Sequence, residues 1–197
     1  MKVAARLQYP INIGYVLDGS ESMKDYFDST KEFSLAYFIE ETGSNNITNV
    51  GVVLSSAEPI LAIPMSPPSP KSKFIDGFDN MKYPGKTGRL DSALKMAADS
   101  LFQQDKANEI LIVITDGVQV NQREALFEQS RELHRRGVSV YVISIGEVCD
   151  FDVLRNIAGD EKRVRLLESG EELTRAKFVK EFAESTRGTQ GNGSFVF

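Results

Sequence analysis

Cysteine and histidine are almost missing from this sequence. The 197 residues include one cysteine, one histidine and no tryptophan. Because Cys149 stands alone, an internal disulfide and a zinc site built from cysteines are both excluded. The histidine, His134, lies among Arg131, Arg135 and Arg136 in a helical pattern, which favours a solvated face. A Ser-His-Asp hydrolase therefore has no suitable base.

Long apolar runs and a strong net charge are missing as well. No segment approaches the roughly 18 apolar residues that would span a bilayer, so we expect no membrane insertion. The first ten residues, MKVAARLQYP, lack the apolar core of a signal peptide. The net charge of −5 argues against a phosphate-binding surface and hence against nucleic acid as a partner. With 41% hydrophobic residues, the chain has the composition of one globular domain with short tails.

Apolar runs alternate along the chain with segments of helical periodicity. The runs predict strands at residues 11–17, 50–54, 59–63, 110–114, 138–145 and 163–167. The helical pattern covers residues 25–41, 71–81, 90–102, 123–136, 151–158 and 171–185. Four prolines within residues 64–70 predict a loop or an extended surface segment there, and the unchanged composition after it favours an internal loop. This alternation predicts an α/β fold that is doubly wound, with a mostly parallel central sheet flanked by helices on both faces.

The first predicted strand ends in a cluster of small oxygen-bearing residues. Asp18, Ser20 and Ser22 recur at every second position, so an extended or turning loop points them to the same side. Carboxylate and hydroxyl oxygens at the carboxyl end of a buried strand suit Mg²⁺ or Mn²⁺. An Asp/Ser helix cap after a strand would show the same residue types, and these residues alone leave both interpretations open.

A second aspartate follows another strong strand. The run at residues 110–114 ends in Thr115-Asp116-Gly117, much as the first strand ends in Asp18-Gly19. Neighbouring strand ends lie about 5 to 10 Å apart, so Asp18 and Asp116 can face one ion. Two unpaired carboxylates would repel each other, and a divalent cation removes that repulsion.

These motifs resemble the metal-ion-dependent adhesion site of the von Willebrand factor type A domain, the fold of integrin inserted domains. That family carries D-x-S-x-S after its first strand and an aspartate in a T-D-G segment, matched here by residues 18–22 and 115–117. The family's threonine often sits in a G-x-T segment before a helix. Gly85-Lys86-Thr87 precedes such a helix, but Thr87 lies one residue too early and Gly88 occupies the usual position. Either the loop carries one extra residue and Thr87 still binds the metal, or the metal lacks this ligand. Of the two, we predict Thr87 as the fifth metal ligand.

The resemblance implies a Rossmann-like domain over residues 10–186, with residues 1–9 as an N-terminal extension and residues 187–197 as a flexible C-terminal tail. It implies a site for Mg²⁺, with Mn²⁺ or Ca²⁺ as alternatives, held by Asp18, Ser20, Ser22, Thr87 and Asp116. A Glu or Asp of a protein ligand would complete the coordination. The implied function is non-enzymatic adhesion to a matrix or cell-surface protein. The implied setting is an extracellular or secreted protein, with this domain as part of a larger multidomain chain. It also implies that ligand binding can shift the last helix, residues 171–185.

Other functions remain open at this point. The metal could only order the loops of an assembly module, or it could serve a metal-dependent hydrolase. The hydrolase would need a nucleophile or general base beside the metal, and none is visible in the sequence. A phosphate-binding loop ending in Gly85-Lys86-Thr87 would need a glycine where Asn80 stands. Cys149 has two interpretations, buried packing or a free thiol that pairs with another chain.

Overall fold

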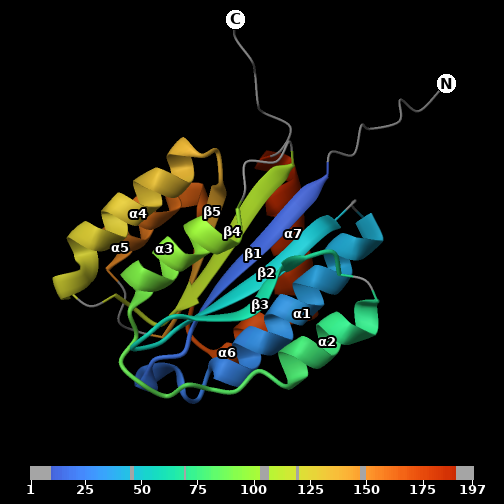
Figure 1. Cartoon of the computed structure of the whole chain (residues 1–197), viewed down its shortest axis with the longest axis horizontal. Coiled ribbons are helices and arrows are strands. Elements are labelled where there is room, and N and C mark those ends of the chain that lie inside the picture. Colours follow the sequence, from blue (N-terminus) through green and yellow to red (C-terminus); the bar gives the residue numbers. More distant parts are fainter. Residues whose placement is uncertain are drawn as a thin grey trace, which may run out of the picture.

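The computed structural model describes residues 10–44, 47–68, 70–102, 107–118, 120–146 and 150–189. One sheet of six strands, in the order β3-β2-β1-β4-β5-β6, forms the centre of the molecule (Figure 1). All neighbouring strands are parallel except β3, which runs antiparallel to β2 at the edge. The strands are β1 (Ile11–Asp18), β2 (Ile47–Ser55), β3 (Ile60–Ser66), β4 (Asn108–Thr115), β5 (Ser139–Ile145) and β6 (Val164–Leu167).

Helices cover both faces of the sheet, as the sequence predicts (Figure 1). One face carries α1 (Phe27–Ser44), α2 (Lys71–Asp79), α6 (Gly170–Thr174) and α7 (Ala176–Thr189). The other face carries α3 (Leu90–Ser100), α4 (Arg123–Arg135) and α5 (Phe151–Ala158). Short 3₁₀ turns, η1 (Glu21–Met23), η2 (Val120–Gln122) and η3 (Glu161–Arg163), lie in the connections. No helix in the described ranges has both the length and the apolar character that crossing a membrane requires.

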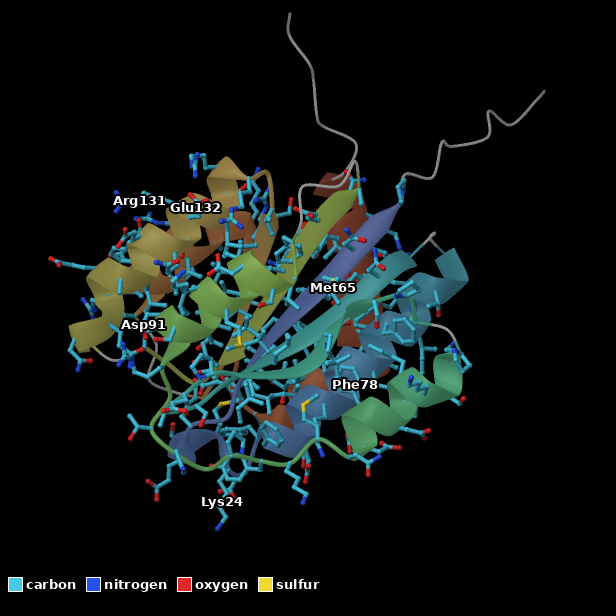
Figure 2. The ribbon with its side chains drawn as sticks, in the orientation of Figure 1. Lys24, Met65, Phe78, Asp91, Arg131 and Glu132 are labelled. Carbon is cyan, nitrogen blue, oxygen red and sulfur yellow. The ribbon has the colours of Figure 1, made fainter. Side chains whose placement is uncertain are left out.

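The central strand β1 shows why the strands are apolar along their whole length. Every residue of β1 is buried, because its alternate side chains enter two separate cores. Tyr15 points to the α1 side, where its hydroxyl donates to the Ser34 carbonyl and Phe78 of α2 meets its ring edge-on (Figure 2). Val16 points to the α3 side and packs among the residues beneath α3, α4 and α5.

The edge strand β3 departs from the predicted loop over residues 64–70. Its last residues, Pro64, Met65 and Ser66, belong to the strand. The pairing of β3 with β2 is irregular at this point, with register shifts on both sides of Val52. Proline is compatible with an edge strand or a bulge, because it has no ladder hydrogen bond to lose there. The loop prediction was therefore wrong for these three residues, and the alternative of an extended surface segment describes them.

The last predicted helix is two helices. The chain breaks helical geometry at Arg175, whose ψ of 126° separates α6 from α7. α7 continues to Thr189, so the predicted domain boundary at residue 186 falls inside it. Residues 190–197 of the predicted tail, residues 1–9 and Cys149 lie outside the described residues. The carboxyl ends of the parallel strands all meet at the lower end of Figure 1, where the loop after β1 and the loop before α3 converge.

Candidate functional site

A pocket of about 290 Å³ opens at the carboxyl edge of the sheet. Its wall is formed by the ends of β1 and β4, the start of α3 and the short turn η2. The lining residues are Asp18, Ser20, Ser22, Gly88, Leu90, Asp116, Gly117, Val118 and Gln122. The structure thus brings four of the five predicted site residues together, and Thr87 is not among them.

Asp18 lies at the base of this pocket and is only 4% exposed. Its Oδ1 accepts a hydrogen bond from the Ser20 backbone amide at 2.9 Å, and its Oδ2 accepts one from the Thr115 hydroxyl at 2.6 Å. Burial raises the pKa of the Asp18 carboxyl above its usual value; the hydrogen bonds from Thr115 and Ser20 oppose that rise, and the Asp116 carboxylate adds to it. Within the described ranges no Lys, Arg or His forms an ion pair with Asp18. Its charge is therefore poorly compensated by the protein.

The two serines of the motif lie side by side. Their hydroxyl oxygens are 3.1 Å apart, within hydrogen-bond distance, with Ser20 half-buried and Ser22 exposed. Ser20 and Ser22 thus line the same pocket as Asp18, the arrangement that the alternation predicts. Glu21, between them, is exposed and does not line the pocket.

The T-D-G segment contributes from the neighbouring strand β4. Asp116 is half-buried and lines the pocket opposite the β1 loop. Thr115 Oγ1 lies 2.6 Å from Asp18 Oδ2 and 2.7 Å from the Gly117 carbonyl oxygen, and its single proton serves one of these acceptors at a time. The Gly117 amide donates to the same hydroxyl at 3.2 Å. Thr115 therefore orients Asp18 and holds the turn that carries Asp116.

The loop before α3 is fastened to the β1 loop by hydrogen bonds. The Gly85 amide donates to the Gly19 carbonyl at 3.1 Å, and the Tyr83 hydroxyl donates to the Ser20 carbonyl at 2.8 Å. Gly85 has a φ of 61°, a backbone conformation that residues other than glycine rarely adopt. These contacts hold the loop before α3 against the loop that carries Ser20.

The loop before α3 presents Gly88 to the pocket, and not Thr87 as predicted from the sequence. Thr87 is exposed, whereas Gly88 is buried and lines the pocket. A Cβ atom on Gly88 would lie 3.0 Å from Asp18 Oδ1 and 3.0 Å from the Ser20 Cβ. Gly88 thus faces the carboxylate at the position where we expected the Thr87 hydroxyl.

Gln122 explains this orientation, and we did not predict its role from the sequence. Its side chain is buried in η2, where Oε1 accepts from the Leu90 amide at 3.2 Å and Nε2 donates to the Gly88 carbonyl at 2.8 Å. The clamp fixes the backbone on both sides of Arg89 and turns Gly88 inward. A single glutamine after a strand carries no recognisable sequence signal, because its partners are backbone atoms about thirty residues away.

The donors in this pocket are carboxylate and hydroxyl oxygens. No three His, Cys, Asp or Glu side chains gather into a metal-binding group in the part of the chain that the structure describes. The pocket has two carboxylates and two serine hydroxyls at its surface, a set suited to a hard divalent cation rather than to zinc. Two carboxylates leave a bound dication without excess negative charge, so it can still attract a third carboxylate.

Comparison with known proteins adds independent findings. A family profile described as "von Willebrand factor type A domain" matches residues 12–181. The chain is 26% identical over 170 residues to the Xenopus laevis von Willebrand factor A domain-containing protein 2, covering 83% of this chain and 21% of that protein. It is 28% identical over 156 residues to the Xenopus laevis collagen alpha-1(XXI) chain, covering 76% of this chain and 16% of the other.

Solved structures share the fold at low sequence identity. Proximal thread matrix protein 1 of the mussel byssus superposes with a TM-score of 0.78 at 19% identity, over 91% of this chain and 46% of that one. A second structure of that protein, described as having a zinc-occupied MIDAS motif, has a TM-score of 0.76 at 18% identity, over 91% of this chain and 46% of the other. The present chain spans less than a quarter of the two Xenopus relatives.

Proposed function

The chain belongs to the von Willebrand factor type A domain family, and from this membership we propose that it is a cation-dependent protein-binding module. Asp18, Ser20, Ser22 and Asp116 would hold Mg²⁺, and an aspartate or glutamate of a protein ligand would bind to that ion. The observation that carries the proposal is the Asp18 carboxylate, 4% exposed and without an ion-pair partner among the described residues, at the base of an open pocket. A buried carboxylate without a counter-charge is unfavourable, and a dication removes that penalty.

The spacing of the serine hydroxyls supports an octahedral ion. Adjacent oxygen ligands of Mg²⁺ lie about 3.0 Å apart, because each metal–oxygen bond is about 2.1 Å long and neighbouring bonds meet at right angles. The 3.1 Å between the Ser20 and Ser22 oxygens suits that edge length. Mn²⁺ prefers similar donors, and Ca²⁺ would need additional oxygens. Since the donor atoms in the pocket are oxygens, and since ligand type and metal availability rather than raw affinity select the ion, we expect Mg²⁺ or Mn²⁺ in this site rather than the zinc named for one similar structure.

Accessibility favours ligand binding over a purely structural ion. Ser22 is exposed, and Ser20 and Asp116 are half-buried, so a ligand carboxylate can reach the proposed ion from solvent. An ion that only ordered the loops would be expected in a closed shell of protein oxygens. The apolar side chains of Leu90 and Val118 at the pocket wall would limit competition from water.

We propose a non-enzymatic role. Among the described residues that line the pocket there is no histidine, cysteine or lysine side chain to act as nucleophile or general base. A hydrolase would have to use Asp18 or Asp116 as the base, and both are assigned to the cation. We further propose that the domain works outside the cell, within a longer multidomain protein. The names of the relatives, a collagen chain and a thread matrix protein among them, and the small share of the relatives that the chain covers support this setting.

Calorimetric titration of the chain with Mg²⁺ and Mn²⁺ tests the cation site. We expect saturable binding of one ion to the wild type and none to Asp18→Ala. Asp25→Ala is the matched control, because Asp25 is an exposed aspartate near the same edge and does not line the pocket. Equal cation binding by wild type and Asp18→Ala would contradict the proposal.

The ligand chemistry needs a separate experiment. An array of synthetic peptides, each with one glutamate and paired with its glutamine version, is probed with the domain in Mg²⁺ and in EDTA. We expect binding that requires both the glutamate and Mg²⁺ and that is absent for Asp18→Ala. Peptide binding that survives in EDTA would mean that the domain recognises proteins through another surface.

A further inference from the structure

Polar side chains form a row across four strands at the carboxyl edge. In the parallel register Asp18 of β1 pairs with Ser55 of β2, and Thr115 of β4 pairs with Ser144 of β5. The pairing of Leu17 with Ile114 places Asp18 beside Thr115, and their side chains are hydrogen-bonded. Paired residues of parallel strands point to the same face, so all four side chains lie on the α3 side of the sheet. The strands are otherwise apolar here, so this row is a departure that needs a physical reason.

Ser55 is the unsatisfied member of the row next to Asp18. Ser55 is 0% exposed, and its hydroxyl oxygen is buried and has no hydrogen-bond partner among the described residues. Most buried hydroxyls are paired, because leaving one unpaired is unfavourable. The Ser55 backbone is well used, since its carbonyl accepts from the Gly19 amide at 2.9 Å. The side-chain oxygen of Ser55, in contrast to its carbonyl oxygen, accepts and donates no hydrogen bond within the described residues.

That oxygen lies at the gap where the α3 loop contributes no side chain. A Cβ atom on Gly88 would be 3.4 Å from Ser55 Oγ and 3.0 Å from Asp18 Oδ1, so both oxygens face the same glycine. Thr87, the expected source of a third hydroxyl, is exposed and is not among the lining residues. Ser55 is not among them either; it is buried next to the lining residues Asp18 and Gly88. The loop before α3 therefore brings no threonine hydroxyl to the site, whereas β2 brings the unpaired hydroxyl of Ser55 close to it.

We propose that Ser55, rather than Thr87, supplies the third side-chain hydroxyl to the bound cation. This inference rests on the proposed function, because it requires a cation beside Asp18. It differs from the site predicted from the sequence, since Ser55 lies on β2 and belongs to neither the D-x-S-x-S nor the T-D-G motif. Gly88 is then the residue that leaves Ser55 room to face the site.

The first test compares Ser55→Ala with Ser144→Ala and Thr87→Ala. Ser144 is a closely matched control: it is 1% exposed, its hydroxyl is also unpaired, and it stands in the same row but beside Thr115. By calorimetry we expect Ser55→Ala to bind Mg²⁺ about tenfold or more weakly, the loss typical of a removed ligand-supporting group. We expect Ser144→Ala and Thr87→Ala to bind like the wild type.

Thermal unfolding in EDTA supplies a second readout. Because the unpaired hydroxyl stabilises nothing without the cation, Ser55→Ala in EDTA should unfold at the wild-type temperature or above it. In saturating Mg²⁺ the same variant should show a smaller rise in unfolding temperature than the wild type. A lower unfolding temperature in EDTA, with unchanged Mg²⁺ affinity, would mean that Ser55 has only a packing role.

Exchange of oxygen for sulfur tests direct binding. Thiolates prefer soft ions, so Ser55→Cys should bind Mg²⁺ weakly and Cd²⁺ at least about tenfold more tightly than the wild type does. Ser144→Cys carries the same added thiol, and both variants retain Cys149, so this control should show no gain for Cd²⁺. This variant also decides the matter if Ser55→Ala fails to fold.

The outcomes separate the two proposals. Loss of Mg²⁺ binding in Asp18→Ala but not in Ser55→Ala, without a Cd²⁺ gain in Ser55→Cys, would overturn the role of Ser55 and leave the proposed function intact. Loss in Thr87→Ala alone would restore the ligand that we predicted from the sequence. No cation binding by the wild type would overturn both proposals.

Discussion

Gln122 orders the end of the loop before α3 by two hydrogen bonds to the backbone. Its amide group satisfies the Leu90 amide and the Gly88 carbonyl, two backbone groups next to the pocket. At this scale the shape of the site depends on hydrogen bonds to the backbone as much as on the motif residues. Thr115 plays the same part on the opposite wall, through Asp18 and the Gly117 turn.

Replacing Gln122 by alanine should therefore loosen the pocket wall formed by Gly88 and Leu90. Two buried backbone groups would lose their partner, and we expect the free energy of unfolding to fall by about 1–3 kcal/mol. Urea denaturation followed by circular dichroism measures the change. Gln129→Ala, a half-buried glutamine of α4, is the comparison and should change the stability little. An equal loss in both variants would show that the Gln122 clamp contributes nothing specific.

Asp91, in the first turn of α3, makes a pH-dependent contribution to the stability of the fold (Figure 2). Both of its carboxylate oxygens accept hydrogen bonds from the Arg89 guanidinium, which lowers the pKa of Asp91 below its ordinary value. A lowered folded-state pKa means that the unfolded chain binds the proton more readily. The stabilisation is therefore complete above the ordinary carboxyl pKa, near 4, and is lost as the pH falls through the folded-state value.

Asp91→Asn should reproduce this loss at neutral pH. We expect the variant to unfold at lower denaturant than the wild type at pH 6–7, and the difference to shrink below about pH 4. Chemical denaturation at a series of pH values measures it. A difference that stays constant down to pH 2 would contradict an origin in the Asp91 charge.

At the scale of elements, α3 approaches the sheet through two paired glycines. Gly14 of β1 and Gly51 of β2 are opposite each other, and the end of α3 packs over them with Leu101 and Phe102. A Cβ atom on Gly51 would lie 2.7 Å from Leu101 Cδ2 and 3.0 Å from backbone atoms of Met65, on the edge strand (Figure 2). The close approach of α3 also sets where its first turn meets the pocket.

Gly51→Ala should be destabilising, because the backbone of Met65 cannot move aside easily. Overpacking of this kind costs about 1–3 kcal/mol. Gly43→Ala is the opposite case: a Cβ there would meet nothing within 4 Å, and it lies within α1. Alanine stabilises helix interiors by up to about 1 kcal/mol relative to glycine, with less near an end, so this variant should gain stability. Thermal denaturation of both variants should give shifts of opposite sign.

At the scale of the whole molecule, the pocket and the two cores share the same strands. Asp18 ends β1, the strand at the centre of the sheet, and β1 contributes to both cores. Aromatic residues anchor α7 on the α1 side, where Phe182 packs against Phe33, Tyr37 and Tyr141. The guanidinium of Arg187 bonds the buried Glu41 at 3.0 Å, so α7 is held to α1 up to its last turns.

Cation binding should therefore stabilise the whole fold if the proposed site is correct. At an ion concentration 100 times the dissociation constant, the linkage adds about 2.7 kcal/mol to the free energy of unfolding. Denaturant titrations in Mg²⁺ and in EDTA should differ by this amount for the wild type and should coincide for Asp18→Asn. A rise of the same size in Asp18→Asn would point to non-specific ion effects.

The sequence by itself determined the layered architecture and the chemistry of the pocket. Continuous apolar runs as short and as rich in β-branched residues as 110–114 favour strands covered on both faces, and helical periodicity is a local property of the chain. The sequence predicts four cation ligands at one place, because parallel strands end at the same edge of the sheet. These ligands are Asp18, Ser20, Ser22 and Asp116. Their place in the pocket follows from that topology.

Tertiary structure decided the details that depend on register and on loop packing. Gly88 rather than Thr87 faces the site because Gln122 holds the Gly88 carbonyl, a contact that no local pattern records. Pro64 joins β3 because the irregular pairing at the sheet edge tolerates it. Ser55 became a candidate only once the strand register set it beside Asp18, since side chains from distant segments meet only in the folded chain.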